Sequence, residues 1–250
     1  MSDDYSDCYY NPAGLVQLSS RQIGSLHADL LGVGLLNHNF FCFAEPDTGM
    51  GSGALSWSHL SANFEPETWS YSLISYSYAD FIFREDTSSH SWGTSLKIIN
   101  QDTPFEDASG YSLDLGYLAI EENISWGICL QNIFSKIHWK TGRNETLPAT
   151  LNAGLSLFPK KEVLYAFDLV LASEDIPRAL RMGAEWKMGE NITFRTGLVQ
   201  RFQKGENISF SAGIGFKTAP SSFFKFSFNY AFVSSQTFPG THYFSLSFFI

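Results

Sequence analysis

The sequence is poor in charged residues and contains no long apolar run. Asp, Glu, Lys and Arg make up 16% of the 250 residues, whereas soluble domains contain about 25%. A membrane-spanning helix needs roughly 20 consecutive apolar residues, and no stretch of this chain approaches that length. Spanning helices are therefore excluded, and any crossing of a membrane would have to be made by β-strands.

The sequence also lacks the motifs of nucleic-acid binding, metal binding and catalysis. The net charge is -9 and no basic cluster is present, although phosphate binding requires concentrated Lys and Arg. The six histidines are scattered without metal-ligand spacing, and no Gly-x-Ser-x-Gly, Walker or dinucleotide-binding pattern occurs. We therefore predict no enzyme activity, no catalytic residue, no metal, no cofactor and no nucleic-acid partner.

Cysteine is rare. The three cysteines, Cys8, Cys42 and Cys129, are widely spaced and form no CxxC pair. Their number is odd and their spacing is not that of a zinc site. We interpret them as small apolar residues of the interior.

Aromatic residues, in contrast, are abundant and follow a strand pattern. In the stretches 222–233 and 241–250, aromatic and aliphatic side chains occupy every second position, with small or polar residues between them. This period of two is that of a β-strand. Similar stretches recur from Arg21 onward, and we predict strands at 21–29, 37–45, 53–62, 69–82, 90–100, 108–120, 123–134, 148–158, 162–172, 178–188, 191–202, 206–217, 222–233 and 241–250.

These strands predict an all-β fold: a transmembrane antiparallel β-barrel of about 14 strands, formed by residues 21–250 as a single domain. Residues 1–20 precede it, and we expect them to form a short N-terminal plug segment in the lumen, the alternative being a simple leader into the first strand. An even strand number places both ends of the wall on one side, as in single-chain bacterial barrels. Short turns alternate with longer connections at 62–68, 100–107 and 135–147. The last strand must pair with the first to close the sheet.

Charged residues within the predicted strands share one parity, opposite to the apolar side chains. We expect this charged parity to face the lumen, because a basic residue that faces lipid at the bilayer midplane costs about 2 to 4 kcal/mol. A soluble β-sandwich would also keep charges off its inner face, but many Gly and Ser residues share the charged parity, which favours a barrel. The charges are Lys97, Asp114, Asp168, Arg181, Glu185, Lys187, Arg195, Arg201, Lys217 and Lys225.

Four of these charges lie on three consecutive predicted strands and form the first candidate site: Asp168, Arg181, Glu185 and Arg195. Residues on neighbouring strands that share a face can pair across the sheet. Two interpretations are open: a cross-strand ion ladder that holds the lumen wall, or the lining of a substrate path.

The N-terminal stretch Asp3-Asp-Tyr-Ser-Asp-Cys-Tyr-Tyr-Asn-Pro-Ala-Gly-Leu15 does not alternate and contains turn residues. It resembles the N-terminal signature of the PorV/PorQ family of outer-membrane proteins, relatives of the FadL fatty-acid transporters. Shorter similarities follow in order, including Gly127-Ile-Cys-Leu-Gln-Asn-Ile and Leu180-Arg-Met-Gly-Ala-Glu-Trp. The resemblance implies a fourteen-stranded barrel in a bacterial outer membrane, with a plug motif in the lumen formed by Asn11, Pro12, Ala13 and Gly14.

Members of that family carry a signal peptide and further plug residues before this signature. This chain begins Met-Ser-Asp-Asp-Tyr, with neither a charged nor an apolar leader region. We therefore expect that the signal peptide is absent from this chain and that the plug segment is truncated.

The resemblance implies an outer-membrane barrel of the FadL/PorV type that lets hydrophobic or small molecules cross the membrane. Its partners would be outer-membrane lipid, and hydrophobic small molecules or detergent in the lumen. The alternative is a scaffold barrel associated with type IX-like secretion, which binds partner proteins through its loops. The loop from Ser135 to Leu147 would then be the docking site, through Trp139, Lys140 and Arg143.

Overall fold

The structure is a computed structural model that describes residues 4–64, 66–173, 177–202, 208–219, 222 and 224–250. Residues 1–3 of the predicted plug segment, residue 65 of a predicted connection, and residues 206–207 and 223 of two predicted strands lie outside the described residues. The described strands are β1 (Gln22–Asp29), β2 (Leu36–Glu45), β3 (Ser52–Phe64), β4 (Glu67–Arg84), β5 (Ser88–Asp102), β6 (Asp107–Glu121), β7 (Ile124–Trp139), β8 (Asn144–Glu145), β9 (Thr150–Lys160), β10 (Val163–Ala172), β11 (Ala179–Met188), β12 (Ile192–Arg201), β13 (Ile208–Lys217), β14 (Lys225–Val233) and β15 (Thr241–Phe249).

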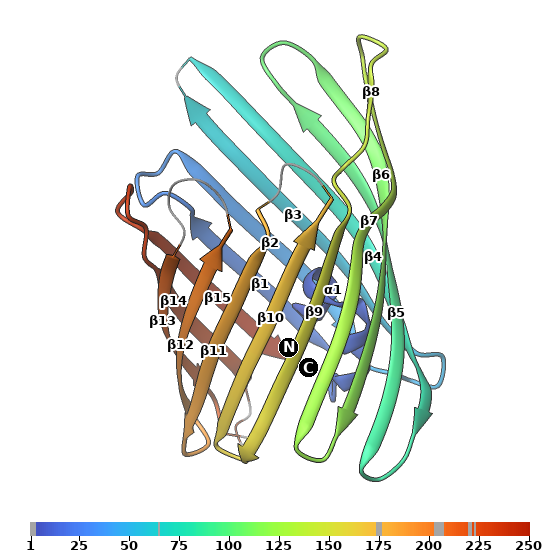
Figure 1. Cartoon of the computed structure of the whole chain (residues 1–250), viewed down its shortest axis with the longest axis vertical. Coiled ribbons are helices and arrows are strands. Elements are labelled where there is room, and N and C mark those ends of the chain that lie inside the picture. The colour runs from blue at the N-terminus through green and yellow to red at the C-terminus, as the bar shows by residue number, and fades with distance from the viewer. Residues whose placement is uncertain (1–3, 65, 174–176, 203–207, 220–221, 223) are drawn as a thin grey trace.

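The long strands form a closed antiparallel barrel (Figure 1). Each strand pairs with its sequence neighbours, except that β7 pairs directly with β9 and the two-residue β8 is an extra strand beside the end of β7. β1 pairs with β15, with Gln22 opposite Phe249 and Asp29 opposite His242. The predicted fourteen-strand wall and its closure by the first and last strands are confirmed, and closure leaves no edge in the wall.

The two faces of the wall differ in composition because side chains alternate along every strand. Large apolar side chains point outward and are exposed, among them Phe41, Trp57, Tyr76, Leu96, Ile128, Phe167, Trp186, Phe210, Phe228 and Phe248. Small polar side chains point inward and are buried, among them Ser56, Ser77, Ser95, Ser112, Ser125, Ser156, Ser209 and Ser247. A water-soluble surface does not carry so extensive an apolar patch.

Two charged residues do not follow the predicted parity. Asp80 stands opposite Trp92, a residue of the outer face. It lies near the end of β4, where its carboxylate accepts hydrogen bonds from the Tyr78 hydroxyl and the Phe81 amide. Lys136, in the part of β7 beyond its predicted end, stands opposite the outward Tyr111 after two register shifts between β6 and β7. The expectation that no strand charge faces outward is therefore wrong for Asp80, which is stabilised by local hydrogen bonds near the rim.

The wall is taller on one side than on the other. β4 has 18 residues and β7 has 16, whereas β14 and β15 have 9 each; about 9 to 11 residues cross a bilayer. Figure 1 shows the β3–β4 and β5–β6 hairpins rising above the β10–β15 side. Strand therefore extends into each of the predicted loops 62–68, 100–107 and 135–147 and covers about half of their described residues, because pairing continues to satisfy backbone groups above the apolar zone.

The N-terminal residues fold inside the barrel. α1 (Asp7–Tyr10) is followed by the 3-10 helix η1 (Pro12–Gln17). Asn11 caps η1 by accepting the Ala13 amide at 3.1 Å, and Pro12 at the first position needs no partner for an amide hydrogen. Across the described residues, no helix is long and apolar enough to cross a membrane.

Candidate functional site

Residues 4–18, here called the N-terminal segment, lie against the inner wall where that wall lacks side chains. A Cβ added to Gly116 would be 2.0 Å from Asn11 Oδ1, and one added to Gly93 would be 2.4 Å from the Ala13 nitrogen. Asn11 Nδ2 donates to the Tyr117 carbonyl at 3.1 Å. The glycines on β5 and β6 therefore make room for the segment, and its backbone contacts the wall directly.

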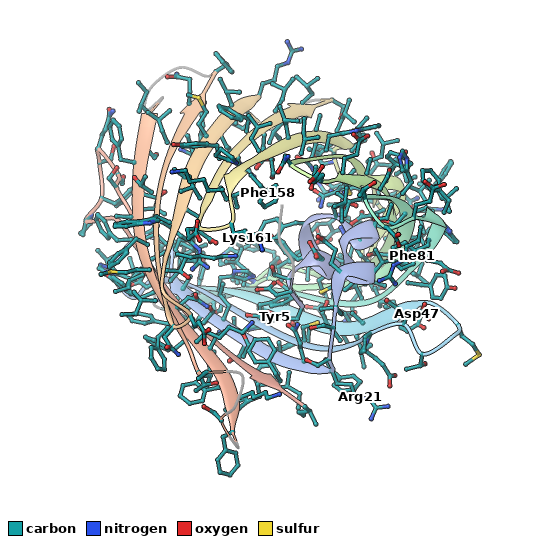
Figure 2. The ribbon with its side chains drawn as sticks, turned by 90° about the horizontal axis from the view of Figure 1, so that it is seen from below. Tyr5, Arg21, Asp47, Phe81, Phe158 and Lys161 are labelled. Atoms are coloured by element: carbon teal, nitrogen blue, oxygen red, sulfur yellow. The ribbon has the colours of Figure 1, made fainter. Side chains whose placement is uncertain are left out.

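The segment also supplies the apolar core of the barrel. Tyr5 stacks near Phe40 with ring centroids 6.2 Å apart, and its amide donates to Gln22 Oε1 at 3.1 Å. The view from below in Figure 2 shows the helices on one side of the interior, with open space on the other side. The buried apolar cluster consists of Tyr5, Cys8, Leu15, Val16 and Leu18 of the segment with Phe40, Cys42, Ala44, Ala54 and Ala79 of the wall.

The space beside the segment contains a cavity of about 720 Å³, here called the central cavity. Tyr9 and Tyr10 line it from the segment, while Asp168, Arg181 and Arg195 line it from β10, β11 and β12. The Tyr10 side chain is 54% exposed, and its phenol, like that of an ordinary tyrosine, is neutral at physiological pH. The cavity thus offers aromatic rings on one side and charged groups on the other.

A second cavity of about 550 Å³, here called the rim cavity, opens near the short turns. It combines apolar side chains such as Phe158 and Val163 with the charged Lys161, Glu185 and Lys187. Figure 2 labels Phe158 and Lys161 by the β9–β10 turn. The rim cavity therefore presents a mixed apolar and charged entrance to the interior.

Arg195 lines both cavities. Its Nε donates to Glu185 Oε2 at 2.7 Å, and its Nη1 donates to Asn229 Oδ1 at 2.8 Å. A Cβ on Gly215 would lie 2.9 Å from Arg195 Nη1 and 2.4 Å from Asn229 Oδ1. Gly215 therefore allows this three-residue polar bridge, of which Arg195 borders both cavities and Glu185 and Asn229 border the rim cavity.

The four charges predicted as one site all face the interior but do not form a continuous ladder. Glu185 and Arg195 are in register and ion-paired at 2.7 Å. Asp168 is in register with Arg181, but in the part of the chain that the structure describes no ion pair joins these two side chains. Asp168 instead places Oδ1 over Gly154, 2.6 Å from the position of an added Cβ. Whether these charges line a substrate path stays a prediction.

The loop predicted as a docking site, residues 135–147, forms the tip of the tall β7–β8 hairpin. Trp139 is the last residue of β7 and only 8% exposed, because it packs in a buried cluster with Ala108 and Ile137, against which Leu147 lies. Lys140 pairs with Asp107, which raises the pKa of Lys140 through a hydrogen bond and charge attraction. Arg143 pairs with Glu145 at 3.0 Å and lies 5.0 Å over the Trp139 ring. Two exposed basic groups are therefore presented at the hairpin tip.

One internal cluster was not expected from the sequence. The sequence predicted only that Lys97 and Asp114 face the lumen. In the structure they form a buried ion pair at 2.5 Å. Asn132 joins them by donating its backbone N–H to Asp114 Oδ1 at 2.9 Å. Opposite charges on the inward parity of adjacent predicted strands were a usable signal for the pair, but the bulge that brings in Asn132 leaves no sequence pattern.

Comparisons with known proteins place the fold but not the family. No protein-family model matches the chain, and no curated protein matches it. Among solved structures, the toluene transporter TbuX of Ralstonia pickettii matches with a TM-score of 0.65 and 10% identity, over 98% of this chain and 93% of that chain. A FadL homologue of Pseudomonas aeruginosa matches with 0.63 and 10%, over 99% and 94%. The monoaromatic hydrocarbon channel CymD matches with 0.62 and 12%, over 99% and 93%. At such identities the likeness concerns the fold, and the chain shares its barrel architecture with these transporters and channels.

Proposed function

We propose that the protein is an outer-membrane channel through which hydrophobic or small molecules pass. The observation that carries the proposal is a closed barrel with an apolar outer face and two interior cavities that meet at Arg195. An apolar outer face suits lipid, and interior cavities beside a bound segment suit passage of a solute. TbuX and CymD, which share the fold, are described as a toluene transporter and a hydrocarbon channel.

The proposed location is a bacterial outer membrane, and the proposed group is the FadL-type barrels, within them the PorV/PorQ branch. The supporting observation is the N-terminal signature, whose Asn11-Pro12-Ala13 stretch lies inside the barrel and contacts β5 and β6. In this proposal the N-terminal segment acts as the plug, because it occupies one side of the lumen and leaves the central cavity on the other.

Uptake by intact cells tests the proposed transport. The chain, fused to a secretion signal, would be produced in an outer-membrane bacterium without its own hydrocarbon channel, and uptake of labelled toluene measured. Gly183 faces the lumen between Arg181 and Glu185, and an added Cβ there meets nothing closer than 3.4 Å. Gly183→Trp should therefore fill the lumen and reduce uptake several-fold, whereas Met182→Trp puts the same ring on the outer face and should leave uptake unchanged.

Uptake no faster than in cells without the protein, for toluene and for small polar solutes alike, would contradict the proposal. Equal uptake by the Gly183→Trp and Met182→Trp variants would also count against passage through the lumen.

A second candidate function is protein binding at the tall side of the barrel, as in a secretion-associated barrel. The observation in its favour is the β7–β8 hairpin tip, where Lys140 and Arg143 are exposed. Purification from a native outer membrane in mild detergent should then retain a stoichiometric partner, and Lys140→Glu with Arg143→Glu should release it. Recovery of the barrel alone from the native membrane would exclude this function.

A further inference from the structure

Two cysteines meet inside the barrel although they are far apart in sequence. The Sγ atoms of Cys8 and Cys42 are 3.4 Å apart, and the two side chains are 1% and 2% exposed. Cys8 belongs to α1 of the N-terminal segment, whereas Cys42 belongs to β2 of the wall. The contact therefore crosses the boundary between the segment and the barrel.

We propose that Cys8 and Cys42 form a disulfide that fixes the N-terminal segment to the barrel wall. A disulfide bond is about 2.05 Å long, so the sulfurs need to approach by roughly 1.4 Å. β2 is held by β1 and β3 on both sides, whereas α1 has only four residues. A small displacement of the short helix is therefore sufficient to bring the sulfurs together.

The reaction is a thiol–disulfide exchange with a disulfide-bearing oxidant. The thiolate of one cysteine attacks the oxidant and forms a mixed disulfide, and the second thiolate displaces the remaining oxidant thiol. The two protein thiols lose two protons and two electrons, and the oxidant disulfide is reduced to two thiols. The periplasm is kept oxidising by such chemistry, so the oxidant in cells follows from the proposed location, whereas the reaction itself needs only a disulfide reagent.

Docking of the segment affects the timing of this reaction. The hydrogen bond with Cys42 and burial raise the pKa of the Cys8 thiol, so little thiolate is present once the segment is docked. Exchange is therefore fastest while the barrel assembles or while the segment is displaced. Once formed, the bond closes a loop that contains β1, the strand at the seam with β15.

The third cysteine provides an internal reference. Cys129 lies on β7 and lines the central cavity. Trypsin cleavage at Arg21, Arg84, Lys97 and Lys136 separates the three cysteines onto peptides 1–21, 22–84 and 98–136. The state of each thiol can therefore be determined in one peptide map of the full chain.

The test refolds the reduced full chain into detergent in the presence of oxidised glutathione, so that exchange can take place while the barrel assembles. The remaining thiols are alkylated in denaturant, and the tryptic peptides are analysed without reduction. We expect peptides 1–21 and 22–84 to be joined, with a mass lower by two hydrogens than their sum, and Cys129 to be alkylated. Alkylation of all three cysteines, or a bond that involves Cys129, would overturn the proposal.

Variants check that the bond depends on this pair. Cys42→Ser should leave Cys8 available for alkylation, whereas Cys129→Ser should leave the cross-link unchanged. If Cys42→Ser does not fold, the wild-type peptide map with its Cys129 reference decides the question alone. Because no step requires transport, failure of the uptake assay leaves this test intact, and a negative peptide map leaves the proposed channel intact.

Discussion

Lys97 and Asp114 form an ion pair inside the barrel, with 2.5 Å between Nζ and Oδ2 and side chains that are 11% and 1% exposed. The other carboxylate oxygen, Asp114 Oδ1, accepts a hydrogen bond from the backbone N–H of Asn132 at 2.9 Å. Asn132 has a φ of 61°, and it lies where the register between β6 and β7 shifts. The carboxylate therefore satisfies backbone at a bulge that would otherwise lack ladder partners.

Removal of the lysine should destabilise the barrel strongly. Lys97→Met leaves Asp114 as a buried charge without its cation, which costs about 3 to 5 kcal/mol. Urea unfolding in lipid vesicles, followed by Trp fluorescence, measures the change in the free energy of unfolding. Lys140→Met is the control, because the Lys140–Asp107 pair is exposed and exposed pairs contribute little. Equal stability of the two variants would show that the buried pair does not hold the wall.

Lysine should be tolerated on one face of β7 and not on the other. Ile128 is exposed on the outer face in the middle of the wall, so Ile128→Lys should cost about 2 to 4 kcal/mol in a bilayer. Ser125 lines the rim cavity, together with Glu121, Glu122, Glu162 and Glu185, so Ser125→Lys should insert normally. The heat-modifiable gel shift of the folded barrel reports insertion, and equal tolerance of both lysines would contradict a lipid-facing outer surface.

A methyl group on the inner wall should displace the N-terminal segment. Gly116→Ala would place Cβ 2.0 Å from Asn11 Oδ1, and overpacking of this kind costs about 1 to 3 kcal/mol. Hydrogen exchange of residues 7–17 should accelerate accordingly, without a change in the strands. Gly53→Ala is the matched control, because its Cβ would meet nothing closer than 3.6 Å. Unchanged exchange in Gly116→Ala would mean that the Asn11 contact does not hold the segment.

Removing the polar bridge at Arg195 should open the boundary that this residue forms between the two cavities. Arg195→Gln loses the contacts to Glu185 and Asn229, so conductance in planar bilayers should rise several-fold. Lys187→Gln removes the same charge from the rim cavity and should change conductance much less. Similar conductances for the two variants would indicate that charge, rather than the bridge, controls passage.

The sequence was sufficient to predict the barrel wall, because the alternation of apolar and polar residues that defines a strand is local and periodic. The period of two along 241–250 and similar stretches predicted the fourteen strands and which face of each strand is apolar. The reason is that every second side chain of such a strand faces lipid and must be apolar. Strand ends were less predictable. The tall β4 and β7 continue through residues that resemble loops, because backbone pairing above the apolar zone needs no apolar side chain.

Only the tertiary structure decided which residues meet inside the barrel. Cys8, Cys42 and Cys129 look alike in the sequence, yet the first two contact each other. Arg195 contacts Asn229 as well as Glu185, although the sequence suggested a ladder of charges alone. The physical reason is that these contacts depend on strand register, on the bulges in β7 and on how the N-terminal segment docks, and these are set by packing between residues distant in sequence.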